Sequence, residues 1–82
     1  MFEVARIYRT DNDSSLKAFV DIIYNGQLLI KGLRVIVGKS DNLFVTMPKA
    51  QGKDGKWYDT VKLLDDAAKD EVSDVVLEAY RV

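Results

Sequence analysis

The strongest local signal in the chain lies in residues 16–37, which read LKAFVDIIYNGQLLIKGLRVIV. Residues 16–24 alternate in polarity, as expected for a strand with one buried face. Asn25-Gly26 follows, and both residues tolerate the positive φ angles of a type I′ turn. Residues 27–37 are apolar on both faces, which is typical of a central strand, and Gly32 indicates a bulge or bend. The stretch therefore predicts a tight antiparallel hairpin.

Further strands are predicted on both sides of this hairpin, separated by runs of turn-forming polar residues. The strands cover residues 3–9, 43–47 and 57–63, and the polar loops cover residues 10–15, 38–42 and 49–56. Pro48 ends the strand at 43–47, because proline cannot donate to a ladder of hydrogen bonds. We expect one antiparallel sheet of about five strands between residues 3 and 63.

The last segment has a helical period. Its apolar residues recur every three to four positions and mark one face of an amphipathic helix. These residues are Ala68, Val72, Val75, Val76 and Ala79. The helix is expected at about residues 66–80, with Asp65 or Asp66 as its N-cap. Strands followed by one helix predict an α+β fold in a single domain, residues 1–82, with the helix packed on one face of the sheet.

One helix is too small to cover a sheet of that width. The second face would carry Phe19, Ile23 and either Leu28 or Ile30, depending on the register. Because 48% of the residues are hydrophobic and the chain is short, we expect this face to meet a second copy. A homodimer is therefore predicted, since closed two-fold dimers are the commonest oligomers. The alternative is a monomer with a partly exposed sheet.

Composition argues against an enzyme. The chain has no Cys and no His, so it lacks a disulfide framework, a thiolate nucleophile, a thiolate or imidazole zinc site and the commonest general base. Residues 52–55 lack the spacing of a Walker or dinucleotide-binding loop. The carboxylates of residues 65–74 could hold Mg²⁺, but their helical spacing fits a cap and a solvated face better. We expect no catalytic residues, no cofactor and no metal.

The sequence also shows no targeting signal. The chain starts without a basic leader, and its apolar runs are far shorter than the about 20 residues that span a bilayer. We therefore expect a cytoplasmic protein that does not bind membranes.

Charge is distributed unevenly along the chain. Residues 1–64 hold ten Lys and Arg against seven acidic residues, a net charge of +3. Residues 65–82 hold two basic residues against six acidic ones, a net charge of −4. A polyanion would therefore approach the sheet or its loops, because the helix would repel it.

The densest basic cluster is residues 48–58, with three Lys, two Gly and two adjoining aromatic residues. Lysines supply phosphate contacts, glycines allow close backbone approach, and an exposed ring at Trp57 or Tyr58 could stack on a base. The alternative is an ordinary solvated hairpin loop with Trp57 in the core. Base-edge contacts could come from Gln51, Lys53 or Arg34.

Several motifs resemble those of the stage V sporulation protein G (SpoVG) family of septation regulators. They are Leu33-Arg34-Val35-Ile36, Gly38, Asn42-Leu43-Phe44-Val45-Thr46-Met47-Pro48, Asp54-Gly55 and Asp59. The resemblance covers nearly the whole chain. It implies a small bacterial cytoplasmic protein with an antiparallel sheet, a C-terminal helix and a dimeric assembly. It also implies a DNA-binding regulator, in some members an RNA binder, linked to septation during sporulation and to wider transcription regulation.

In the family, the stretch just after Met-Pro is associated with nucleic acid, and here it falls on residues 49–53. The family usually has adjacent basic residues where this chain has Ala50-Gln51, so the basic patch is thinner here. Two hypotheses follow. In the first, a homodimer binds DNA or RNA through the nucleic-acid-binding residues Lys49, Gln51, Lys53, Lys56 and Arg34, with Arg9 as a further auxiliary contact. In the second, the chain binds a cell-division or regulatory protein through its sheet edges or the acidic helix face, Asp70, Glu71, Asp74 and Glu78. The sequence alone does not separate them.

Overall fold

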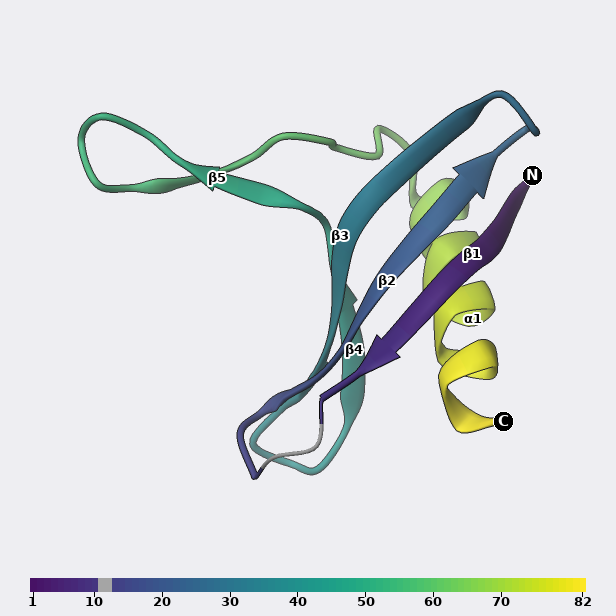
Figure 1. The fold of residues 1–82 in the computed structure, drawn as a ribbon, viewed down its shortest axis with the longest axis horizontal. Coiled ribbons are helices and arrows are strands. Elements are labelled where there is room, and N and C mark those ends of the chain that lie inside the picture. Colours follow the sequence, from purple (N-terminus) through teal and green to yellow (C-terminus); the bar gives the residue numbers. More distant parts are fainter. Residues whose placement is uncertain (11–12) are drawn as a thin grey trace.

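The computed structural model describes residues 1–10 and 13–82, and Figure 1 shows how their strands and helix are arranged. In this part of the chain, four strands form an antiparallel sheet in the order β1-β2-β3-β4, and two more form a separate ribbon, β5-β6. The elements are β1 Phe2–Arg9, β2 Leu16–Tyr24, β3 Leu28–Val37, β4 Leu43–Thr46, β5 Lys49–Gln51, β6 Trp57–Asp59 and α1 Asp66–Arg81. The α+β class and the C-terminal helix are therefore confirmed.

The β2–β3 hairpin forms as its sequence predicts. Asn25 and Gly26 have φ angles of 54° and 69°, and the Gln27 amide donates to the Tyr24 carbonyl at 3.0 Å. These are the features of a type I′ turn, whose twist matches that of the flanking strands. The polar loop predicted at residues 10–15 includes residues 11 and 12, which lie outside the described residues.

The predicted bulge at Gly32 is also present. Gly32 has a φ of 90°, and the β2–β3 register shifts between Val20 and Ile22. The residue between them, Asp21, turns its carboxylate to the disturbed ladder, where Oδ1 accepts a hydrogen bond from the Gly32 amide at 3.2 Å. The β1–β2 register shifts at the same level, between Val4 and Arg6. The two ladders that flank β2 are therefore both irregular next to Asp21.

The core lies between α1 and the face of the sheet that the helix covers (Figure 1). Its buried hydrophobic side chains come from β1, β2, β3 and α1 and are Phe2, Ala18, Val20, Ile22, Ile30, Leu33, Val35, Val72 and Val76. Burying one of the Val, Leu, Ile or Phe side chains in this set stabilises the fold by about 1.5–3 kcal/mol. Leu28 and Ile30 were the two alternatives for the second face, and both are wrong. Ile30 is buried under the helix, and Leu28, two residues earlier in β3, lies on the same side, next to Phe2 and Ala68. Phe19 and Ile23 point away from the core, as expected, because they alternate with Val20 and Ile22.

Two acidic side chains hold α1 in place. Asp65 is the N-cap, and its Oδ1 accepts a hydrogen bond from the Ala68 amide at 2.6 Å, which complements the positive end of the helix dipole. Glu71, in the second turn, accepts a hydrogen bond from the Phe2 amide at 2.8 Å and so ties the helix to the first residue of β1. No helix in the described ranges is long and apolar enough to cross a bilayer.

The strand predicted at 57–63 differs from the structure. Only Trp57–Asp59 is extended into a strand, and it pairs with β5 rather than with the main sheet. Buried Pro48 ends β4, and its carbonyl then accepts the Thr60 amide at 2.9 Å and the Thr60 hydroxyl at 3.2 Å. This closure folds residues 49–59 back on themselves, so the main sheet has four strands and not five. Val61 and Leu63 still pack against the core, but from an irregular segment.

Candidate nucleic-acid interface

The β5–β6 hairpin carries the basic cluster and projects away from the main sheet (Figure 1). At its tip the Gly52 amide donates to the Lys56 carbonyl at 2.8 Å, and the Gly55 amide donates to the Gly52 carbonyl at 3.1 Å. Gly55 has a φ of 82°, the left-handed conformation that ends a three-residue hairpin loop. The segment predicted as a plain loop at 49–56 is therefore half of an ordered ribbon.

A hydrogen-bonded pair orders this tip. The Asp54 carboxylate accepts a hydrogen bond from the Tyr58 hydroxyl at 2.5 Å and another from the Lys56 amide at 3.0 Å. The hydrogen bonds from Tyr58 and then from Lys56 lower the pKa of Asp54, and the bond to Asp54 raises the pKa of Tyr58. The Tyr58 ring also lies over Gly52, where an added Cβ would come within 2.9 Å of the ring. Tyr58 is thus held in place on one face of the ribbon.

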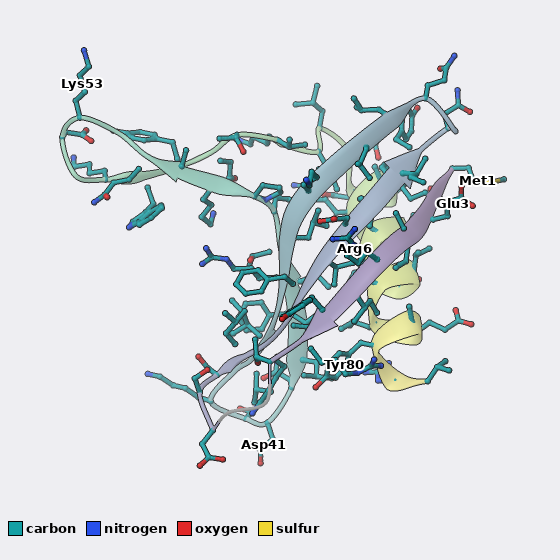
Figure 2. The ribbon with its side chains drawn as sticks, in the orientation of Figure 1. Met1, Glu3, Arg6, Asp41, Lys53 and Tyr80 are labelled. Atoms are coloured by element: carbon teal, nitrogen blue, oxygen red, sulfur yellow. The ribbon has the colours of Figure 1, made fainter. Side chains whose placement is uncertain are left out.

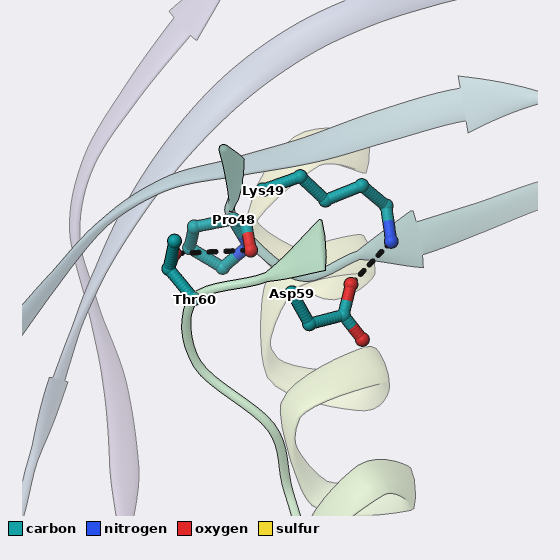
Figure 3. A network of polar contacts seen from close by, with 4 residues as sticks. All are labelled: Pro48, Lys49, Asp59 and Thr60. Atoms are coloured by element: carbon teal, nitrogen blue, oxygen red, sulfur yellow. Dashed lines mark hydrogen bonds and ion pairs between the residues drawn. The ribbon is translucent and has the colours of Figure 1, made fainter. Parts of the chain in front are cut away.

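The three hairpin lysines have different surroundings. Lys49 pairs with Asp59, its partner in the β5–β6 register, through an ion pair at the base of the hairpin (Figure 3). Lys53 extends from the tip into solvent (Figure 2). Neither Lys53 nor Lys56 makes an ion pair with any residue of 1–10 or 13–82. Two of the three cations are therefore free to meet a phosphate, while Lys49 would exchange one partner for another.

Gln51 and Trp57 face each other across the ribbon. The Gln51 amide nitrogen donates to the Gly55 carbonyl at 3.1 Å, which leaves its side-chain oxygen at the surface. Trp57 is 60% exposed. The alternative interpretation that placed Trp57 in the core is therefore wrong, because its strand belongs to the ribbon and not to the main sheet.

Arg34 does not lie on the hairpin. It projects from β3 on the face opposite the helix, with its guanidinium carbon 5.6 Å from the centre of the Phe19 ring. Its β4 partner is Thr46, three residues before the hairpin begins at Lys49. The structure therefore groups four of the five predicted residues on one ribbon and leaves Arg34 on the neighbouring sheet.

Around Arg34, the uncovered face of the main sheet carries a group of exposed apolar side chains between charged ones. We call it the open face, and it carries the exposed side chains Tyr8, Phe19, Leu29 and Phe44. Tyr8, Leu29 and Phe44 were not assigned to this face from the sequence. The signal was present, since Phe44 alternates with Leu43 and Val45, which pack on the core. The face also bears Arg6, in front of the sheet in Figure 2.

Two other predicted surfaces are changed by the structure. Arg9, considered as an auxiliary contact, is engaged by the end of α1 and donates to the carbonyls of Ala79, Tyr80 and Val82. Within the acidic helix face, Glu71 is used by the Phe2 amide. Asp70, Asp74 and Glu78 remain exposed.

Comparison with known proteins agrees with the resemblance found in the sequence. The SpoVG family profile matches residues 2–82. A protein of Archaeoglobus fulgidus named "Putative septation protein SpoVG" is 34% identical over 76 residues, which are 93% of this chain and 88% of that protein. "Putative septation protein SpoVG 1" of Listeria monocytogenes is 32% identical over 77 residues, which are 94% of this chain and 74% of its own length. A Staphylococcus aureus protein, also named "Putative septation protein SpoVG", is 33% identical over 75 residues, 92% of this chain and 74% of its own. The chain belongs to the SpoVG family.

Proposed function

We propose that this chain is a cytoplasmic, homodimeric regulator of septation that binds nucleic acid through the β5–β6 hairpin. The observation that carries the proposal is the exposed ribbon, whose Lys53 and Lys56 make no ion pair among the described residues. The septation role rests on the names of its relatives in the family. Lysines on a projecting ribbon suit the phosphates of a polynucleotide, because such contacts release condensed counterions.

Dimerisation would raise the affinity of this site. The open face offers a second copy an apolar surface with Phe19 and Phe44 exposed and with the charges of Arg6 and Asp21 opposite each other in register. A two-fold pair would present six hairpin lysines instead of three. Each phosphate that is neutralised on duplex DNA steepens the dependence of log K on log salt by about 0.9. Six contacts therefore produce a strongly salt-dependent affinity that three do not reach.

The binding site is tested by reversing its charge. The triple variant Lys49→Glu, Lys53→Glu, Lys56→Glu should lose binding to duplex and single-stranded pools at low salt in fluorescence anisotropy. A matched control is Lys39→Glu. Lys39 lies in a loop with the same hydrogen-bond pattern as the hairpin tip. There the Gly38 amide donates to the Asn42 carbonyl at 2.8 Å, and the Asp41 amide donates to the Gly38 carbonyl at 3.1 Å. It lies at the other end of the molecule, as the labels Asp41 and Lys53 show in Figure 2. Equal binding by the triple variant and the wild type would reject the site.

The dimer is tested on the open face. Phe44→Asp should convert the particle to a monomer in sedimentation velocity, because it places a charge within the apolar contact. Leu64→Asp is the control, since Leu64 is 92% exposed in the segment before α1. A wild-type chain that sediments as a monomer at all concentrations would reject this part of the proposal.

A second candidate function is a protein-binding module in cell-division control. It is favoured by the exposed carboxylates of Asp70, Asp74 and Glu78 on α1 and by the open edges of β1 and β4. Such edges can accept a strand from a partner. Under this alternative the wild-type chain would bind neither DNA nor RNA at low salt, and a purified division protein would bind with an affinity that Asp74→Lys lowers.

A further inference from the structure

We infer that Trp57 stacks on an unpaired base, so that the hairpin prefers single-stranded nucleic acid to duplex. This inference rests on the proposed function and adds a substrate class to it. The relevant features are the exposure of the Trp57 ring, the engagement of its neighbour Tyr58, and the polar surroundings of both.

Trp57 is the ring of the hairpin that is free to stack. It is 60% exposed on β6, and no aromatic or cation–π contact to it occurs among residues 1–10 and 13–82. Its cross-strand partner is Gln51, and Lys49 lies one pair further along the same face. The indole therefore lies on the same face as an amide that can reach a base edge and as the Lys49–Asp59 ion pair, whose ammonium group would meet a phosphate by leaving Asp59.

Tyr58 is the other aromatic residue of the hairpin, and it is already engaged. Its hydroxyl donates to Asp54 at 2.5 Å, and one side of its ring covers Gly52. The two adjoining rings therefore have different roles: Tyr58 shapes the tip, and Trp57 on the opposite ribbon face presents its ring to a ligand.

The surroundings of Trp57 favour a base over an apolar protein surface. Every residue of β5 and β6 is exposed, and the ribbon around Trp57 is made of Lys, Gln, Asp and Gly together with Ala50 and Tyr58. Protein interfaces surround an aromatic anchor with further apolar side chains, as the open face does around Phe19. Nucleic-acid sites instead combine an isolated ring with cations, because each base offers a π face between charged phosphates.

This geometry discriminates against duplex. In a single strand the bases are accessible, so a ring can stack on one of them without breaking a pair. In a duplex the same contact needs a base to leave its stack, which costs free energy. The lysines of the hairpin contact phosphates in either form. Trp57 should therefore contribute to binding of single strands and very little to binding of duplex.

Trp57 also provides its own reporter, because it is the single tryptophan of the chain. The experiment titrates the full chain with oligothymidine of about 12 nucleotides and with a random-sequence duplex of equal length, at one salt concentration. A saturating concentration of the single strand should quench the tryptophan fluorescence. A saturating concentration of the duplex should leave most of the fluorescence intensity unchanged. Trp57→Leu should weaken single-strand binding about tenfold and duplex binding less than about twofold, while Trp57→Phe keeps most of the affinity. Circular dichroism checks that each variant is folded.

The outcomes separate this inference from the proposed function. Unchanged single-strand affinity in Trp57→Leu, or saturation without quenching, would overturn the stacking contact while the lysine site stands. An equal loss for both forms would overturn the preference for single strands. A change in tryptophan fluorescence when the protein is concentrated without nucleic acid would assign Trp57 to a protein contact and reject the inference. If the wild-type chain binds neither form, the proposed function itself fails.

Discussion

Arg9 holds the end of the helix by two contacts with Tyr80. Its Nη2 donates to the Tyr80 carbonyl at 2.7 Å, and its guanidinium carbon lies 5.4 Å from the centre of the Tyr80 ring. The same nitrogen reaches the carbonyl of Val82 at 3.2 Å. A cation at this position satisfies carbonyl groups that have no partner within the helix and complements its dipole. The last turn of α1 is therefore fixed by β1, although the two residues are 71 positions apart.

Removing this contact should destabilise the chain. Arg9→Ala is expected to lower the free energy of unfolding by about 1–2 kcal/mol, because it removes a charged hydrogen bond and a cation–π contact at a partly solvated site. Urea denaturation followed by circular dichroism measures the change. Lys39→Ala is the control, since Lys39 is exposed in the loop between β3 and β4 and should change stability by less than about 0.5 kcal/mol. Equal stability of the two variants would contradict the capping role.

The N-cap predicts a second effect on stability. Asp65→Ala should cost about 1 kcal/mol, because the Ala68 amide loses its acceptor, while Asp65→Asn should keep most of the stability. Asp66→Ala is the matched control. Asp66 lies in the first turn and is engaged by Lys69 at 3.7 Å, a pair too exposed to contribute much. Thermal unfolding of the three variants ranks them, and a larger loss in Asp66→Ala than in Asp65→Ala would reverse the assignment.

The Asp54–Tyr58 hydrogen bond makes the hairpin pH-dependent at two extremes. The lowered pKa of Asp54 means that its stabilisation is present above the ordinary value of 3.8 and is lost as pH falls through the folded value. The raised pKa of Tyr58 means that its stabilisation is present below 10.0 and is lost as pH rises through the folded value. The hairpin should therefore be ordered throughout the neutral range.

The Tyr58→Phe variant tests this pair directly. It removes the hydroxyl and keeps the ring, so the pKa of Asp54 should rise towards 3.8. Carbon-detected NMR titration of the Asp54 carboxyl group measures the shift. Tyr24→Phe serves as the control, since Tyr24 lies at the end of β2 in the main sheet. An Asp54 titration identical in Tyr58→Phe and wild type would show that the hydroxyl does not bond the carboxylate in solution.

Replacing Gly32 should destabilise the fold through backbone strain rather than through a steric clash. An added Cβ would meet only Pro48 Cβ, at an ordinary 3.9 Å, but the φ of 90° is unfavourable for any side chain. Gly32→Ala should therefore cost about 1–3 kcal/mol in urea denaturation. Lys31→Ala, at the exposed neighbouring position, should be close to neutral. A neutral Gly32→Ala would mean that the bulge relaxes without cost.

The parts of the fold that depend on local chemistry were predictable from the sequence. Asn25-Gly26 predicted the turn, Gly32 the bulge, and Asp65 was one of two caps considered for the helix. The predicted strands at 3–9, 16–24, 27–37 and 43–47 agree with the structure to within one residue at each end, as does the helix at 66–80. In each case the deciding interaction joins residues that are close in sequence.

The parts that depend on distant partners were not predictable. Alternation at 57–63 indicates a strand but not the strand it pairs with, so the ribbon with β5 was missed and Trp57 was also considered as a core residue. The position of Arg9 under the last helical turn depends on packing between the two ends of the chain. The four hairpin residues of the candidate site lie together because they are neighbours in sequence, whereas Arg34 is separated from them by the geometry of the sheet.

The anchoring of the hairpin at Pro48 and Thr60 has an evolutionary consequence. Every residue of its two strands is at the surface, so an exchange there leaves the interior of the protein unaltered. Under the proposed function, relatives would be free to vary ligand choice on the ribbon while the main sheet keeps its packing. Chimaeras in which only residues 49–59 are exchanged between relatives should bind the ligand of the protein that supplied the hairpin. Their melting temperature should be that of the protein that supplied the rest of the chain.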